Sequence, residues 1–174
     1  MLISHSTWPR VGVLGCGFAA ILALLEASHD PRDAAFVWNV TSSAPIGLYR
    51  VHMAKTLHRG DVVLVMPPEW VQRLAAARRY LPEHIPLVKR IAALAGQKLC
   101  AKNGIILIDD KPVAARLRVD SSGRALPAWQ GCHTLHSNEV FLLMKDVRTS
   151  FDGRYFGPVP VSSVLGKLQP LWTR

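Results

Sequence analysis

Charged residues, aromatic residues and cysteine are all scarce in this chain. Of its 174 residues, 19% are charged, 7% are aromatic and three are cysteine, whereas 49% are hydrophobic. This balance excludes an intrinsically disordered chain and supplies enough apolar material for a core. No internal repeat is visible, so the length predicts one domain with a small appendage.

The chain also lacks any dense run of basic residues, although its net charge is +9. The positive excess lies in residues 29–174, where lysines and arginines are scattered and never form a run of five. We therefore expect no nucleic-acid partner. The pattern fits a solvated surface compatible with anionic lipid headgroups or acidic partners.

One long hydrophobic run is present, at residues 11–25 between Arg10 and Glu26. As a helix it would measure about 22 Å, short of the ~30 Å hydrocarbon core. A cleaved signal peptide and a buried core helix are alternatives. The nearest cleavage site has Leu25 where a small residue is needed, and three glycines suit a membrane helix. We predict an N-terminal tail over 1–10, a retained membrane anchor over 11–27, a linker over 28–38 and the main domain over 39–174.

Short β-branched or apolar runs dominate the main domain. They predict strands over residues 36–40, 47–51, 61–66, 104–108 and 139–144, each bounded by Gly, Pro, Asn or Asp. One insertion differs, because residues 67–70 suit a helix start and lead into a helix over 71–81 that Pro82 stops. The fold class is therefore mainly β, with an inserted helix.

Lys89 stands inside the apolar run 85–96. If this run is a strand, alternation places Lys89 on the same face as Leu87 and Ile91, and Arg90 on the other. Burial disfavours an ammonium ion, which lowers its pKa and leaves an amine able to accept a proton near neutral pH. Lys89 is therefore a candidate general base; the alternative is a lysine whose stem covers the core while its ammonium stays wet.

Two other segments hold candidate site residues, although each alone is typical of a turn. In residues 41–49, Pro45 and Gly47 can fix Ser43 at the rim of a sheet. In residues 150–158, Asp152 and Arg154 could form an ion pair, on the same side of an extended chain as Ser150.

In order, these segments resemble the boxes of type I signal peptidases, most closely those of TraF-type conjugative-transfer peptidases. Residues 43–50 resemble the serine box, 88–91 with Gly96 the lysine box, and 150–152 with 154–157 the closing box. Three departures stand out. Proline follows Ser43 by two residues, which favours the TraF-type branch; Gly153 replaces the usual serine; and the start of the longer Gly-Asp-Asn-Arg form is absent.

The resemblance implies a signal-peptidase-like β-sheet or barrel domain behind an N-terminal transmembrane helix. Ser43 would be the nucleophile and Lys89 its general base, without cofactor or metal. The backbone N–H of Ser43 and the hydroxyl of Thr41 would stabilise the oxyanion. The supporting residues would be Ser150, Asp152 and Arg154, and the substrate would add a β-strand along Ala44, Pro45 and Ile46.

The implied function is endopeptidase cleavage of exported precursors, such as signal-peptide-bearing proteins or prepilin, including pilin cyclisation for conjugative transfer. The enzyme would sit in the bacterial inner membrane, contacting lipid through its N-terminal helix, with the catalytic domain on the periplasmic side. The alternative from another class is a catalytically silent, membrane-bound module that grips extended segments in a secretion or conjugation apparatus.

The cysteines leave three alternatives open. Cys100 and Cys132 could form a disulfide if the domain is exported. They could instead bind a metal with His133 and His136, although adjacent residues of a strand point to opposite faces. A Ser/His/Asp triad using either histidine with Asp152 would compete with the lysine base.

Overall fold

The computed structural model describes residues 36–41, 43–53 and 56–174, and residues 35–174 form a compact unit. The predicted tail and anchor, with most of the linker, lie outside the described residues. β1 begins at Phe36, so the strand occupies residues 36–38 of the predicted linker. Within the described ranges, no helix has the length and apolar character needed to cross a membrane.

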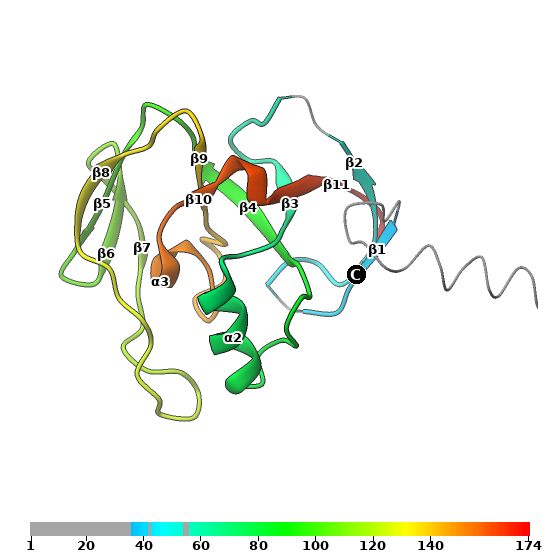
Figure 1. The fold of residues 1–174 in the computed structure, drawn as a ribbon, viewed down its shortest axis with the longest axis horizontal. Coiled ribbons are helices and arrows are strands. Elements are labelled where there is room, and N and C mark those ends of the chain that lie inside the picture. The colour runs from blue at the N-terminus through cyan, green and yellow to red at the C-terminus, as the bar shows by residue number, and fades with distance from the viewer. Residues whose placement is uncertain (1–35, 42, 54–55) are drawn as a thin grey trace, which may run out of the picture. The chain divides into compact units, whose positions relative to one another are not determined.

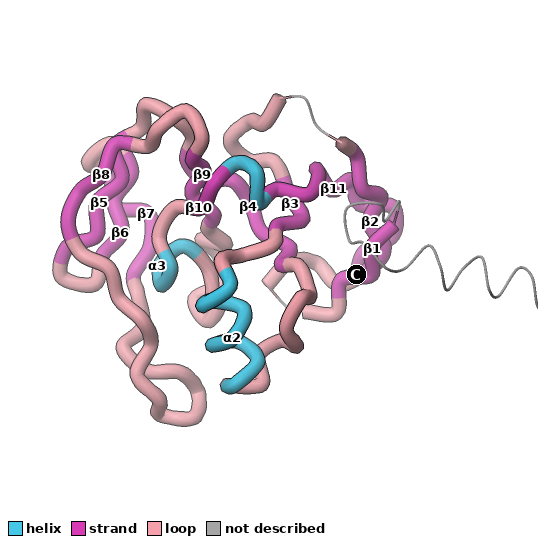
Figure 2. Tube along the Cα trace, viewed as in Figure 1, coloured by secondary structure: helices cyan, strands magenta, loops and turns pink. Residues whose placement is uncertain are grey.

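Strands are far more extensive than helices in the described chain, as the sequence predicts (Figure 2). A seven-stranded antiparallel sheet has the order β1-β2-β11-β3-β4-β9-β10 (Figure 1). Its strands are β1 (Phe36–Asn39), β2 (Gly47–His52), β3 (Val62–Val65), β4 (Leu87–Ala93), β9 (Glu139–Leu142), β10 (Val159–Pro160) and β11 (Val164–Thr173).

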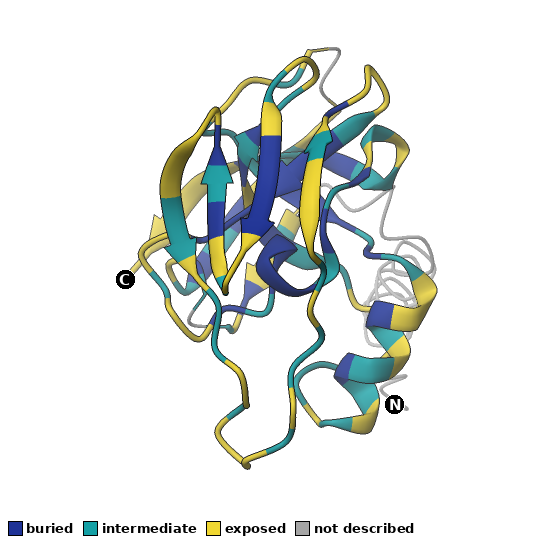
Figure 3. Cartoon of the chain, turned by 90° about the vertical axis from the view of Figure 1, so that its left-hand side faces the viewer, coloured by how far each residue is buried: buried dark blue, intermediate teal, exposed yellow. Residues whose placement is uncertain are grey.

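A second antiparallel sheet has four strands in the order β7-β6-β5-β8. They are β5 (Lys98–Lys102), β6 (Ile105–Ile108), β7 (Lys111–Ala115) and β8 (Gly131–Thr134). Figure 3 colours the strands by burial and shows buried and exposed residues on neighbouring strands. β5 is buried through its middle, whereas edge strand β8 is mostly exposed.

The inserted helix exists but is shorter than predicted. α2 (Glu69–Ala77) ends before Leu81, because Arg79 adopts φ 59°. The N–H of Tyr80 then bonds to Ala75 O and that of Arg79 to Ala76 O, the hydrogen-bond pattern of a Schellman C-cap. Glycine usually occupies this left-handed position, so the sequence pointed to Pro82 as the stop instead.

Residues 150–158 turn, as the segment alone indicates, and do not run extended. Gly153–Phe156 forms a short helix, α3, whose N-cap is Asp152. The Asp152 side chain accepts a hydrogen bond from the Arg154 backbone N–H, so it satisfies a donor of the first turn. A 3₁₀ turn, Val161–Ser163, then leads into β11.

The seven-stranded sheet curls around an apolar cluster. β2 and β4 are separated by β11 and β3, so three interstrand spacings, roughly 14 Å, would divide them in a flat sheet. Side chains from both ends of this span pack together inside the curl. They are Ala44, Tyr49, Leu64, Val88, Met144, Leu165 and Leu168. The curl is what allows the β1–β2 turn to approach β4.

Candidate active site

The three sequence segments meet at the Lys89 amine. Ser43 lies in the turn between β1 and β2, Lys89 lies in β4, and Ser150 lies between β9 and α3. Lys89 Nζ donates hydrogen bonds to Ser43 Oγ and to Ser150 Oγ, both at 3.2 Å. Direct proton transfer requires about 2.6–3.2 Å between heavy atoms, so the amine and the Ser43 hydroxyl are within reach.

Strand alternation carries Lys89 inward. Lys89 is 3% exposed, whereas Arg90 points outward and donates to Gly60 O at 2.6 Å. Ile91, which alternation places on the same face as Lys89, is also buried. This agrees with the face predicted by parity and excludes a lysine with a fully hydrated ammonium.

Burial lowers the pKa of Lys89 from 10.5 to about 8. The negative charge of Asp152 opposes this effect and raises the pKa, while the positive charge of Arg154 lowers it. A substantial fraction of the amine is therefore neutral near pH 8 and able to accept a proton.

Asn39 holds the loop that carries Ser43, a role that sequence reasoning missed. Its side chain is 4% exposed, and its Nδ2 donates to Thr41 O (2.9 Å), Ala44 O (3.1 Å) and Pro45 O (3.0 Å). The hydroxyl of Tyr49 donates to the same Pro45 carbonyl at 2.7 Å. The only indication in the sequence was that Asn39 is a polar residue at the end of the apolar strand β1.

Thr41, the predicted oxyanion donor, belongs to the same network. Its Oγ1 donates to Asn39 Oδ1 at 2.8 Å and lies 3.1 Å from Ser43 Oγ. Because a hydroxyl has a single proton, Thr41 must release Asn39 before it can donate to an oxyanion. The Thr41 hydroxyl is thus beside the Ser43 hydroxyl, but its proton points to Asn39 in this structure.

Asp152 and Arg154 form a buried ion pair behind the amine. The two side chains are 0% and 1% exposed, and Arg154 Nη2 donates to Asp152 Oδ2 at 2.8 Å. Arg154 also donates to Val147 O (2.6 Å) and Met144 O (3.1 Å), while Asp152 Oδ2 accepts from the Met144 N–H at 3.0 Å. The pair therefore ties together the loop that holds Ser150.

Gly153, which departs from the family pattern, is required by close packing. A Cβ here would lie 2.5 Å from the Phe141 ring and 2.6 Å from Leu142 O. Real Cβ atoms essentially never come this close to other heavy atoms, and the backbone oxygen cannot move aside cheaply. The serine of the family pattern would not fit at this position, and the amine instead contacts Ser150.

A cavity of about 460 Å³ opens beside Ser43. Residues 44–46, the predicted substrate strand, line one part, and residues 144–147 line another. The carbonyls of Ala44 and Pro45 accept from Asn39, and that of Ile46 accepts from the Arg174 N–H at 3.0 Å. An added strand would meet carbonyls that already accept hydrogen bonds, two of them in the case of Pro45.

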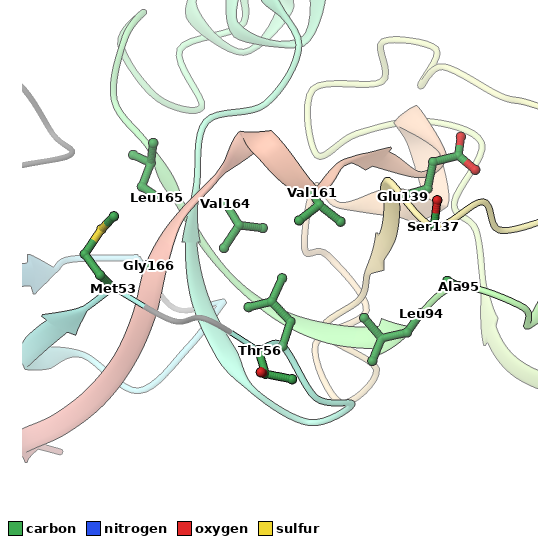
Figure 4. A pocket seen from close by; sticks show the side chains of 11 residues that line it. Met53, Thr56, Leu94, Ala95, Ser137, Glu139, Val161, Val164, Leu165 and Gly166 are labelled. Atoms are coloured by element: carbon green, nitrogen blue, oxygen red, sulfur yellow. The ribbon is translucent and has the colours of Figure 1, made fainter.

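A second cavity, of about 390 Å³, is lined by other residues. Figure 4 shows Met53, Thr56 and Leu94 around it, with Glu139 and Ser137 at one end. The lining is largely apolar and includes neither Ser43 nor Lys89. This cavity was not predicted from the sequence.

Cys100 and Cys132 are joined by a disulfide, with an S–S distance of 2.08 Å, across paired positions of β5 and β8. The cysteine–histidine metal site is therefore wrong, since both thiols are consumed. The histidine triad is wrong too. His133 Nε2 bonds to Glu139, while the Asp152 carboxylate bonds to Arg154 and to the Met144 N–H.

These features define a class of protein. The family model of the signal peptidases, peptidase S26, matches residues 8–172. The chain therefore belongs to the signal peptidase family, in its TraF-type branch.

Named relatives specify the branch. The conjugal transfer protein TraF of Agrobacterium fabrum is 34% identical over 145 residues, covering 78% of this chain and 81% of the relative. A plasmid transfer protein TraF of Escherichia coli is 34% identical over 170 residues, covering 91% and 94%. A solved structure of a signal peptidase I from Enterococcus faecalis has a TM-score of 0.39 at 20% identity, covering 66% of this chain and 98% of that one.

Proposed function

We propose that this chain is a serine endopeptidase with Ser43 as nucleophile and Lys89 as general base. The observation that supports it most is the 3.2 Å contact between the Ser43 hydroxyl and a buried amine whose pKa is lowered to about 8. A nucleophile within hydrogen-bond reach of a base, with the base oriented by a third group, is the usual arrangement for covalent catalysis. Ser150 is that third group.

The reaction follows from these atoms. Neutral Lys89 takes the Ser43 proton as Oγ bonds to the scissile carbonyl carbon, and then gives that proton to the leaving amine. An acyl-enzyme remains, which water or an incoming amine resolves. The oxyanion would be held by the Ser43 N–H and by Thr41, once its hydroxyl turns away from Asn39. Asp152 and Arg154 hold the loop of Ser150 and act as positioning residues.

The substrate is proposed to be an exported precursor that lies extended in the cavity beside Ser43. Residues 44–46 and 144–147 line it, and Pro45 has no N–H, so Ala44 and Ile46 supply the donors on that side. TraF relatives are named for conjugal and plasmid transfer, which favours a precursor from that process, such as prepilin.

Membrane anchoring through residues 11–27 and a periplasmic catalytic domain complete the proposal. The apolar run 11–25 supports the inner-membrane anchor. The Cys100–Cys132 disulfide supports the periplasmic side, because such bonds persist in oxidising compartments.

The test is cleavage of a prepilin precursor by the detergent-solubilised full chain. We expect Ser43→Ala and Lys89→Met to abolish cleavage. Ser121→Ala and Lys102→Met change exposed residues of the same types and should cleave at the wild-type rate. Cleavage that survives either dyad substitution would exclude the proposed mechanism. Wild-type protein that binds the precursor without cutting it would favour the silent binding module.

A further inference from the structure

Two histidines and a glutamate converge on the connection between β8 and β9. His133 lies on β8, His136 in the following turn and Glu139 at the start of β9. Their candidate ligand atoms all lie within 4.8 Å of one another. His133 Nε2 and Glu139 Oε2 are 2.6 Å apart, and the backbone N–H of His136 donates to the same oxygen at 2.9 Å.

The backbone around these three residues is well anchored. Cys132 is tied to β5 by the disulfide, next to His133. Leu135 is 2% exposed, donates its N–H to Gln97 O at 3.0 Å and accepts from the Gly96 N–H at 2.8 Å. The Glu139 N–H donates to His136 O at 3.1 Å. The side chains therefore project from a preorganised turn.

The side chains are also accessible. His133 and Glu139 are 37% and 23% exposed, and His136 is exposed. In Figure 4, the Glu139 carboxylate lies at the end of the second cavity near Ser137, away from Met53 and Thr56. Solvent and ions can reach the cluster without any opening of the core.

The donor set is one that binds transition metals. Two imidazole nitrogens with one carboxylate oxygen suit Zn²⁺, with bonds of about 2.0–2.2 Å and donor atoms about 3.3 Å apart in tetrahedral geometry. The candidate donor atoms here lie within 4.8 Å of one another, which is close to that spacing. A metal ion would replace the hydrogen bond between His133 Nε2 and Glu139 Oε2.

We propose that His133, His136 and Glu139 form a binding site for a divalent transition-metal ion of the zinc type, with a fourth position open to water. Because β8 belongs to the four-stranded sheet and β9 to the seven-stranded sheet, the ion joins the two sheets. Its role is structural, and it lies outside the Ser43–Lys89 centre. The disulfide frees this site from competition by the neighbouring thiols.

Titration of the metal-free full chain with Zn²⁺ and Co²⁺ tests the site. The host is the Ser43→Ala protein, so that self-cleavage plays no part and the outcome is independent of catalysis. Calorimetry should show saturable binding with a 1:1 component, and Co²⁺ should give the visible absorption of a tetrahedral nitrogen–oxygen site. Bound zinc should raise the unfolding temperature, since only the folded state brings the three ligands together.

His136→Ala and Glu139→Gln should each weaken this binding at least tenfold and abolish the rise in unfolding temperature. His136 is exposed and Gln keeps the shape of Glu139, so both variants should fold. His84→Ala, which changes an exposed histidine outside the cluster, should bind as the host does. Absence of saturable binding, or equal binding by the host and by His136→Ala, would overturn the site.

Discussion

Both sheets bury apolar residues, but in the part of the chain that the structure describes only the larger one also buries charged residues. The core of the four-stranded sheet is apolar, with Leu99, Ile106 and Ile108 among its members, and a disulfide crosses its edge. The larger sheet, with the loops that follow it, contains the charged trio Lys89, Asp152 and Arg154. Among the described residues, none of the buried polar side chains lies on a strand of the smaller sheet.

The smaller sheet therefore contributes mainly to stability, whereas the larger sheet also carries the candidate active site. A buried ammonium and a buried ion pair cost desolvation energy that simple packing would avoid. In the larger sheet, this desolvation cost accompanies the placement of the Lys89 amine next to the Ser43 hydroxyl. The smaller sheet contributes apolar burial and a covalent link instead. Substitutions in the two regions should therefore differ in their effect on stability and on activity.

The largest loss of stability is expected from Arg154→Met. Removing the guanidinium leaves the Asp152 carboxylate buried without its partner, which typically costs about 3–5 kcal/mol. Denaturant unfolding measures the change. Arg148→Met removes an exposed arginine from the same loop and should change stability by less than about 0.5 kcal/mol. Equal effects of the two substitutions would show that the buried pair is unimportant.

Loss of the disulfide should come next. Replacing both Cys100 and Cys132 by alanine should destabilise the fold by about 3–4 kcal/mol, because the bond closes a long loop. The Ser43–Lys89 contact lies in the other sheet, so molecules that remain folded should keep their peptidase activity. Cys16→Ala is the control and should change neither property. A parallel loss of activity at a temperature where the double variant is folded would remove the distinction between the sheets.

Lys89→Met should change the free energy of unfolding in the opposite direction, raising stability while abolishing activity. The lowering of the pKa from 10.5 to about 8 corresponds to roughly 3 kcal/mol that the protonated lysine costs at pH 7. The unfolded chain holds more protons between pH 8 and 10.5, so wild-type stability should rise with pH across that window.

The advantage of the Lys89→Met variant should accordingly shrink from pH 8 to pH 10.5. Paired unfolding curves across this range measure it, with Lys102→Met as the exposed control. A variant that is less stable than the wild type at pH 7 would mean that burial of the charged Lys89 amine does not destabilise the folded protein.

The smallest effect, about 1–3 kcal/mol, is expected from Gly153→Ala. The added Cβ would meet the Phe141 ring and Leu142 O, so either the turn or the sheet must shift. Activity should fall too, since Ser150 lies in the adjoining loop. Gly104→Ala, in the turn between β5 and β6, meets open space at φ 80° and should cost about 1 kcal/mol of backbone strain without loss of activity. Equal activity of the two variants would contradict this assignment.

Much of the β-fold was predictable from local patterns. The β-branched runs of β1, β2, β3, β6 and β9 were expected, and alternation alone gave the buried face of Lys89. β11 was not predicted, because Gly166, Gln169 and Pro170 interrupt its apolar pattern. Its strand character comes from pairing with β2 and β3, which are distant in sequence.

The residues that adjust the site were harder to foresee. Asn39 acts through three carbonyls that only the folded turn gathers around it. α3 is too short to show helical periodicity, and Gly153 looked like a departure until the Phe141 contact explained it. Glu139 meets His133 across a turn, where strand alternation gives no guidance.

The pH dependence of kcat/KM for precursor cleavage tests the central claim most directly. If Lys89 is the base, kcat/KM should fall tenfold per pH unit below an apparent pKa of about 8 and level off above it. An apparent pKa between 6 and 7, as for a histidine base, or a rate independent of pH, would contradict the lysine mechanism.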